Sequence, residues 1–384
     1  MNAAAARGEP GLYVHVPFCA RACPYCDFDF VVGRSPDVSA YLKGLDAEVQ
    51  ARQLSGTAVR TVYVGGGTPS LLGASGLRRL FAQLRATFDT HGVLETTVEL
   101  NPEHVDAALL DVLVEVGCDR VSLGAQTLDA GGLVQLGRVH SGAGALAAAG
   151  EAVGRGLAVS ADLIVGWAGQ TTDSLERDLN AFDAAGVEHL SVYALTIEPA
   201  TPWEALVRRG KRSLPDDDHQ ATLLEHVAGW ARRGGWDHYE VASYARSMAS
   251  RAQHNAGYWT ARDYVGLGPS AASAQFGMEG EVRRQNNVRG WAAWLNDPSV
   301  AEVETLDGVA AAVESLWLGL RLLGGVDVTT FLSHFPAVDR RWLDRRIQGS
   351  VRAGNLVWTH DGRLRVAPDR WLMHDAVVAD LLEP

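Results

Sequence analysis

The chain has 384 residues, of which 47% are hydrophobic and 21% are charged. These proportions are ordinary for a globular protein longer than one average domain, so they exclude a disordered or fibrous class. A net charge of −12 with dispersed basic residues argues against nucleic acid as the main partner, and no apolar run approaches the roughly 20 residues of a membrane span.

The N-terminal segment, "MNAAAARGEPG", lacks the apolar core of a secretory signal, so we expect a cytoplasmic protein. Three of the four cysteines lie close together and one lies far away. That distribution makes a poor disulfide framework and favours metal binding or catalysis in a reducing compartment.

The first half of the chain alternates short β-rich runs with longer amphipathic runs. Strands are predicted at residues 12–16, 59–64, 95–100, 120–123, 159–165 and 189–195. Helices are predicted between them at residues 41–53, 77–88, 105–116, 143–153 and 174–185. This alternation predicts right-handed crossovers and a parallel sheet, and six units close only part of an eight-stranded barrel.

Beyond about residue 200 the pattern loosens into helical runs at 217–233, 290–296, 309–322 and 340–353. A hairpin turning at Asp361 and Gly362 and a final helix after Pro368 follow. The predicted fold class is therefore α/β: a partial (β/α)6 TIM-like barrel with a mostly helical, winged-helix-like C-terminal domain. The expected divisions are residues 1–210 for the barrel, 211–285 for a connecting region and 286–384 for the C-terminal domain.

The segment "CARACPYC" places Cys19, Cys23 and Cys26 in a C-x3-C-x2-C pattern directly after the first strand. If the loop curls, all three sulfurs can reach one small inorganic centre. Structural zinc usually takes four protein ligands, and no second Cys/His pair follows at a suitable distance. Three thiolates on a [4Fe–4S] cluster would leave one iron free to bind a substrate. A zinc site and three buried thiols remain the alternative interpretations, and Cys118 is expected to be a small buried apolar group.

Other unusual segments also fall at the ends of predicted strands. "GGGTP" follows the second strand, "ELNPE" covers the third, "SLGAQ" closes the fourth and "ADLIVG" makes up the fifth. In parallel α/β folds, functional sites are built at the carboxyl ends of the strands. The sequence therefore predicts that five segments converge on one rim with the cysteines.

The cysteine spacing, with the aromatic Tyr25 before the third cysteine, resembles the signature of the radical S-adenosylmethionine (SAM) enzymes. In that superfamily the open iron of the [4Fe–4S] cluster chelates the amino and carboxylate groups of SAM. One electron then breaks a C–S bond and gives a 5′-deoxyadenosyl radical. The resemblance implies that the protein holds, orients and shields this cofactor.

From Tyr13 to about Gly268 the rim is similar to the branch that contains oxygen-independent coproporphyrinogen III oxidase and the HemW heme chaperones. The resemblance implies that Tyr13 contacts SAM near the cluster, together with Tyr25. It further implies backbone contacts and polar contacts to SAM from Gly66, Gly67, Thr68, Glu99, Gln126, Arg138 and Asp162.

Two features separate the members of this branch. The oxidase-type sequences carry a fourth cysteine two positions after the third, where this chain has Phe28. They also carry an N-terminal extension, whereas about a dozen residues precede the first predicted strand here. Both differences favour resemblance to the heme chaperones.

The element "HNAGYW", His254 to Trp259, matches the HNxxYW element of the HemW family and implies that His254 takes part in heme binding. There are two departures. Ala272 stands where HemW-like sequences commonly carry a histidine, and "WAGQ" from Trp167 replaces "LPGQ".

The resulting hypothesis is a radical SAM protein with a [4Fe–4S] cluster and SAM that binds heme and delivers it to hemoproteins. Its expected partners are heme or another small-molecule substrate, a hemoprotein client and an electron-donor protein. If it is an enzyme, its reaction begins with reductive cleavage of SAM. The alternatives are a methyltransferase or cyclopropane-forming enzyme of the same branch, a coproporphyrinogen oxidase, and a zinc-bound interaction module.

Overall fold

The computed structural model describes residues 8–277 and 280–382. The fold is built around one large β-sheet. The sheet has 12 strands in the order β14-β13-β12-β11-β1-β4-β5-β6-β7-β8-β10-β9. Its centre is parallel and comprises β1 (Gly11–Val16), β4 (Thr61–Gly66), β5 (Glu95–Leu100), β6 (Arg120–Gln126), β7 (Ala158–Val165) and β8 (His189–Ala194).

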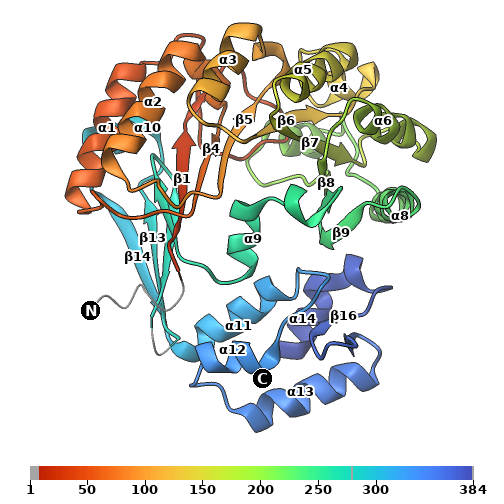
Figure 1. Cartoon of the computed structure of the whole chain (residues 1–384). Coiled ribbons are helices and arrows are strands. Elements are labelled where there is room, and N and C mark those ends of the chain that lie inside the picture. The colour runs from red at the N-terminus through yellow and green to blue at the C-terminus, as the bar shows by residue number, and fades with distance from the viewer. Residues whose placement is uncertain (1–7, 278–279, 383–384) are drawn as a thin grey trace.

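Helices connect these parallel strands and cover the outer side of the sheet (Figure 1). They are α1 (Val38–Ala51), α2 (Gly73–Thr87), α3 (Ala107–Glu115), α4 (Ala130–Gln135), α5 (Gly142–Gly154) and α6 (Thr172–Ala184). After β8 come α7 (Pro202–Arg208) and α8 (Asp217–Arg233). The predicted partial barrel of six βα units is confirmed, and its largest hydrophobic core lies between the sheet and these helices.

Additional strands extend the sheet on both flanks. On the β1 side, β11 (Tyr264–Leu267) pairs in parallel, followed by antiparallel β12 (Ala272–Phe276), β13 (Val282–Asn287) and β14 (Ala301–Leu306). On the β8 side lie β10 (Ser243–Ala245) and β9 (Asp237–Glu240). The predicted division between residues 285 and 286 falls inside β13.

The C-terminal part is helical, and its hydrophobic core also includes Ala274 of β12 and Val282 of β13. It contains α11 (Gly308–Gly319), α12 (Val328–His334), α13 (Arg340–Arg352) and α14 (His374–Leu382). The predicted hairpin is present as β15 (Leu356–Trp358) and β16 (Leu364–Val366). Within the described ranges, none of the helices is both long and apolar enough to cross a membrane.

Helix α9 (Gln253–Trp259) carries the HNAGYW motif and lies on the inner side of the sheet, between the strands and the C-terminal helices (Figure 1). Its first N–H groups, from Gln253 and His254, donate to the carboxylate of Glu95 at the start of β5, each at 2.9 Å. An anion at a helix N-terminus satisfies N–H groups that lack partners within the helix. The motif is thereby fixed at the amino-terminal end of the central strands.

A buried polar junction joins the β11–β14 flank to α1. The carboxylate of Glu48, on α1, accepts hydrogen bonds from the Gly268 N–H at 2.9 Å and the Asn287 side chain at 2.7 Å. It also accepts one from the indole of Trp294 at 3.0 Å, on α10 (Trp291–Asn296). Because a buried charge needs several partners, this junction fixes the flank relative to the barrel.

Gly44 offers a test of the packing at this junction. Any Cβ at this position would collide with the fully buried ring of Trp294, which is also held by Glu48. We therefore expect Gly44→Ala to lower the free energy of unfolding by about 1–3 kcal/mol, as overpacking does. Chemical denaturation measures the change.

The matched control is Gly150→Ala on α5, where a Cβ meets nothing within 4 Å and the position is exposed. Alanine there should stabilise the helix by up to about 1 kcal/mol. Equal effects of the two substitutions would contradict the packing described for Trp294.

Candidate functional site

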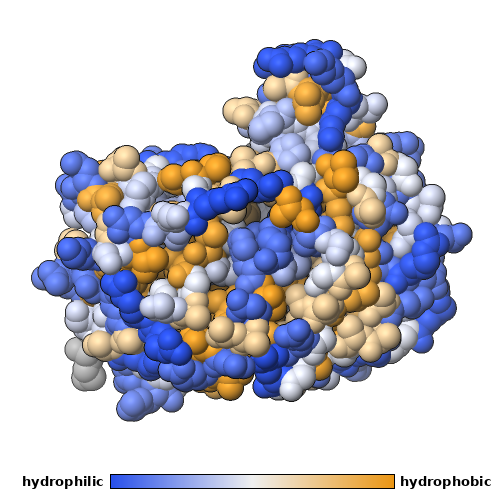
Figure 2. All heavy atoms as spheres, turned by 90° about the horizontal axis from the view of Figure 1, so that it is seen from above, coloured by the Kyte–Doolittle hydropathy of each residue, from blue (hydrophilic) through white to orange (hydrophobic). Residues whose placement is uncertain are grey.

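A cavity of about 560 Å³ opens at the carboxyl ends of the central strands. Eleven of the 13 residues predicted as site residues line it. The segments that were predicted to converge on one rim therefore do lie around one cavity. They are Cys19, Cys23, Tyr25, Cys26, Gly66, Gly67, Thr68, Glu99, Gln126, Arg138 and Asp162. Viewed from above, the hydrophobic surface residues form separate groups bordered by hydrophilic ones (Figure 2).

The cysteine loop is held against the end of β4. Two short strands, β2 (Phe18–Cys19) and β3 (Val31–Val32), pair at its base, and the Cys26 N–H donates to the Cys23 carbonyl at 3.3 Å within it. A Cβ on Gly67 would lie 2.8 Å from the Phe18 carbonyl oxygen and 3.1 Å from the Cys19 sulfur. Only glycine therefore lets the loop lie this close to the strand.

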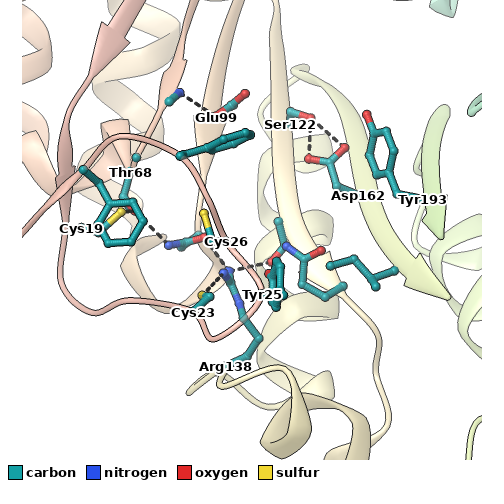
Figure 3. Close-up of a pocket in the computed structure, with 18 of the residues that line it drawn as sticks. Cys19, Cys23, Tyr25, Cys26, Thr68, Glu99, Ser122, Arg138, Asp162 and Tyr193 are labelled. Atoms are coloured by element: carbon teal, nitrogen blue, oxygen red, sulfur yellow. Dashed lines mark hydrogen bonds between the residues drawn. The ribbon is translucent and has the colours of Figure 1, made fainter. Parts of the chain in front are cut away.

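The three thiols face the same cavity from one loop (Figure 3). Burial raises the pKa of the Cys19 thiol, and burial raises the pKa of the Cys26 thiol to about 11. Metal binding must therefore displace protons from these sulfurs. In the described part of the chain, no group of three or more Cys, His, Asp or Glu side chains is arranged so that it could hold a single metal ion. Three thiols on one cavity wall suit a cluster, in which each cysteine binds a different iron.

Arg138 places a positive charge beside the cysteines. Its Nη1 lies 3.5 Å from the Cys23 sulfur, and its Nη2 donates to Asn101 Oδ1 at 2.5 Å and to the Gly124 carbonyl at 2.9 Å (Figure 3). Burial acts to lower the pKa of Arg138, but the neighbouring Tyr25 and Cys23 outweigh it and raise that pKa. Its Nε–H is buried and has no acceptor among the described residues, so the side chain can still bind an anion.

Two carboxylates, on strands β5 and β7 at either side of β6, lie deeper in the cavity. Glu99 accepts hydrogen bonds from the Tyr63 hydroxyl at 2.7 Å and the Gly66 N–H at 3.0 Å. Asp162 accepts from the Ser122 hydroxyl at 3.1 and 2.9 Å (Figure 3). Burial raises the pKa of Glu99 to about 7 and that of Asp162 to about 6. Both can change their charge near neutral pH, which is typical of functional sites.

Gln126 and Tyr25 are positioned by local backbone features. Gln126 has a positive φ of 64° at the end of β6, where the pairing with β7 shifts register. Such a conformation is costly for a residue with a side chain and is often found at functional sites. Tyr25 packs in a small hydrophobic cluster with Trp203, whose backbone N–H donates to the Pro24 carbonyl at 2.8 Å. Helix α7 thereby holds the cysteine loop in place through its first turn.

The other two predicted site residues lie elsewhere. Tyr13 lines a neighbouring cavity, where its hydroxyl is 3.0 Å from His15 Nδ1. His254 is only 3% exposed, with Nδ1 2.8 Å from the Thr61 hydroxyl and Nε2 2.7 Å from the Tyr258 hydroxyl. Burial lowers the pKa of His254 to about 3, so its ring is neutral. Its role in heme binding stays a prediction.

Sequence reasoning did not single out several polar residues that line the first cavity, among them Asn101, Ser122, Tyr193 and Asn255. Strand periodicity could have found two of them, because Ser122 alternates with Gly124 and Gln126 on one face of β6 and Tyr193 alternates with Ser191 on β8. Trp167, one of the sequence departures, is 4% exposed and packs with Leu136 behind the rim.

The raised pKa of Glu99 predicts a pH-dependent stability. Between its ordinary value of 4.5 and about 7, the folded chain retains a proton that the unfolded chain has released. The contribution of this group to the free energy of unfolding is therefore lost as the pH rises through that window. We expect the Tm of Glu99→Gln, relative to that of the parent chain, to increase between about pH 5 and about pH 8.

The control for this measurement is Glu115→Gln on the outer helix α3. Glu115 is exposed, and its pKa is lowered by a hydrogen bond from Arg78. Its stabilising contribution is instead lost as the pH falls, so this variant should show no such increase. A pH-independent Tm difference for Glu99→Gln would contradict the assigned protonation.

Comparison with known proteins gives four findings. Residues 13–182 match the model of the Radical SAM superfamily. The chain is 36% identical over 384 residues to the heme chaperone HemW of Mycobacterium tuberculosis, covering 98% of this chain and 95% of that protein. It is 30% identical over 372 residues to HemW of Bacillus subtilis, covering 92% and 96%. The solved structure of coproporphyrinogen III oxidase (HemN) from Escherichia coli, a radical SAM enzyme, superposes with a TM-score of 0.81 at 20% sequence identity. The superposition covers 98% of this chain and 92% of that chain, so the two proteins share the fold.

Proposed function

The chain belongs to the HemW family of the radical SAM superfamily, and from this premise we propose that it is a heme chaperone. In this proposal it carries a [4Fe–4S] cluster, binds SAM and heme, and delivers heme to hemoproteins in the cytoplasm. A hemoprotein client and an electron-donor protein are its partners.

The observation that carries the cofactor proposal is the convergence of three cysteines and a buried arginine on one cavity. Cys19, Cys23 and Cys26 would hold the cluster, which, once bound, supplies an electron to a C–S bond of SAM. Arg138, with its spare Nε–H, would pair with the carboxylate of SAM.

The remaining residues would position SAM and exclude water. Gly66, Gly67 and Thr68 allow backbone to approach its amino-acid end, and Glu99, when ionised, would accept from its ammonium group. Asp162 would accept from ribose hydroxyls, and Gln126 would add a polar contact. Tyr25, backed by Trp203, covers the side of the cavity beside Cys23 and Cys26.

Phe28 supports the chaperone over the oxidase. It lines the cavity and is 61% exposed, at the position where oxidase-type sequences carry a further cysteine. A phenyl ring cannot replace a thiol in metal binding or redox chemistry, whereas it can pack against an aromatic ligand.

Heme titration of the protein, after anaerobic reconstitution with iron and sulfide, tests the proposal. We expect a saturable change in the heme absorption spectrum with about one heme per chain, and no conversion of coproporphyrinogen III to protoporphyrinogen. Absence of any heme-dependent change would contradict the chaperone function. Turnover of coproporphyrinogen III would replace it with the oxidase function.

A further inference from the structure

A second cavity, of about 650 Å³, adjoins the first, and Phe28 lines both. Its walls come from β1, from β11 to β13, from helix α9 and from helix α11 of the C-terminal part. The volume lies within the usual range of cofactor and ligand sites, about 300–1,000 Å³. The residues predicted to bind the cluster and SAM lie in the first cavity, apart from Tyr13.

Aromatic side chains dominate one side of the second cavity. Tyr258 and Tyr264 lie edge to face, with ring centroids 4.8 Å apart, and Trp259 and Phe276 also line the space. Aromatic surfaces of this kind bind flat ring systems through stacking and edge-to-face contacts. The cavity therefore suits a planar aromatic ligand.

One cation in this cavity is available for an anionic ligand. Arg262 is half-buried, and among residues 8–277 and 280–382 its guanidinium has no ion pair or side-chain hydrogen bond. Burial and the nearby charge of Arg60 lower the pKa of Arg262, as expected for a guanidinium without a carboxylate beside it. Arg284, which also lines the cavity, is already paired with Glu304 and Glu314.

The histidines near this cavity are not free to bind iron. His15 has both ring nitrogens in hydrogen bonds, to the Tyr13 hydroxyl at 3.0 Å and to the Asp29 carbonyl at 2.9 Å. His254 does not line the cavity, and its Nε2 forms a hydrogen bond with the hydroxyl of Tyr258. Ala272, which does line it, stands where a histidine is common in HemW-like sequences.

We propose that this second cavity is the heme site, that the aromatic side chains hold the porphyrin ring, and that Arg262 pairs with a porphyrin carboxylate. No histidine binds the iron, and His254 is a positioning residue that orients Tyr258. This inference rests on the proposed heme function and assigns its site. It requires that a porphyrin without iron binds nearly as well as heme.

The test compares heme with metal-free protoporphyrin IX, using the reconstituted protein. The parent chain should bind both with dissociation constants within about fivefold of each other. Arg262→Met should weaken both by at least about tenfold, and Arg262→Lys should restore part of the loss because it keeps a point charge. Blocking the carboxylates as methyl esters should weaken binding to the parent chain but have little effect in Arg262→Met.

Arg283→Met is the matched control, because Arg283 is an exposed arginine on β13 next to Arg284 and does not line the cavity. It should leave both affinities unchanged. Iron content and SAM affinity should stay at parental levels in all these variants, which separates loss of the heme site from loss of folding.

Three further variants probe the role of the iron and the positioning role of His254. Ala272→His adds an imidazole to the cavity, so it should shift the absorption bands of bound heme and tighten heme without tightening metal-free porphyrin. His254→Ala should weaken heme and metal-free porphyrin equally, and His254→Gln should recover part of the loss by restoring a hydrogen bond to Tyr258.

The outcomes separate this inference from the chaperone proposal. If the parent chain binds heme but not the metal-free ring, or if Arg262→Met changes neither affinity, the site assignment is overturned while the chaperone function stands. If the parent chain binds no heme, the proposed function and this inference both fail.

Discussion

Replacing Cys23 with alanine is expected to reduce the iron content of the reconstituted protein from about four atoms per chain to background. Cys23 lies on the same cavity wall as Cys19 and Cys26, and its sulfur is 3.5 Å from Arg138. With two thiolates left, two of the four irons would lack a protein ligand, and SAM can fill only one position. Iron and sulfide analysis, together with the absorbance near 400 nm, measures the result.

Cys118→Ala provides the control, because Cys118 is buried at 6% exposure and its thiol donates to the carbonyls of Thr96 and Arg120, away from the cavity. Its iron content should equal that of the parent chain, with only a modest loss of stability. Full iron content in Cys23→Ala, or equal losses in both variants, would refute the cluster assignment.

The second large effect is expected for Arg138→Met. The substitution keeps much of the apolar volume of the side chain but removes the charge and the hydrogen bonds to Asn101 and Gly124. Loss of a charge-assisted pair with the SAM carboxylate should raise the dissociation constant of SAM about 100-fold, which corresponds to about 2.7 kcal/mol. Equilibrium binding of SAM to the reconstituted protein measures it.

Arg85→Met serves as the control, since Arg85 donates to the Val116 carbonyl on the outer helices. Arg138→Lys should recover only part of the affinity, because an ammonium cannot form a paired contact with a carboxylate. The iron content of each variant must be measured alongside, given the contact with Cys23. Unchanged SAM affinity in a fully loaded Arg138→Met protein would show that this arginine does not bind SAM.

The central six strands were predictable because they are short β-rich runs that alternate with amphipathic helices. The flanking strands were not. Strand β13 reads "VRRQNN", and its polar residues carry no strand signal, since it is held by pairing with β12 and β14. Pairings between strands distant in sequence depend on tertiary context that local patterns do not contain.

The first cavity was largely predictable because its residues sit in motifs at strand ends. The placement of Tyr13 and His254 was not. His254 reaches the start of β4 and β5 only because α9 folds back under the sheet, and nothing local in "HNAGYW" indicates that packing. Asn255, next to it, extends into the first cavity instead. The second cavity likewise forms only when α11 packs beside α9.

The most direct test of the account is low-temperature electron paramagnetic resonance of the reconstituted, chemically reduced protein with and without SAM. A cluster held by Cys19, Cys23 and Cys26 has one iron open to SAM, so we expect a [4Fe–4S] signal whose g values shift when SAM is added. A colourless protein without such a signal, or a signal that SAM leaves unchanged, would contradict the account.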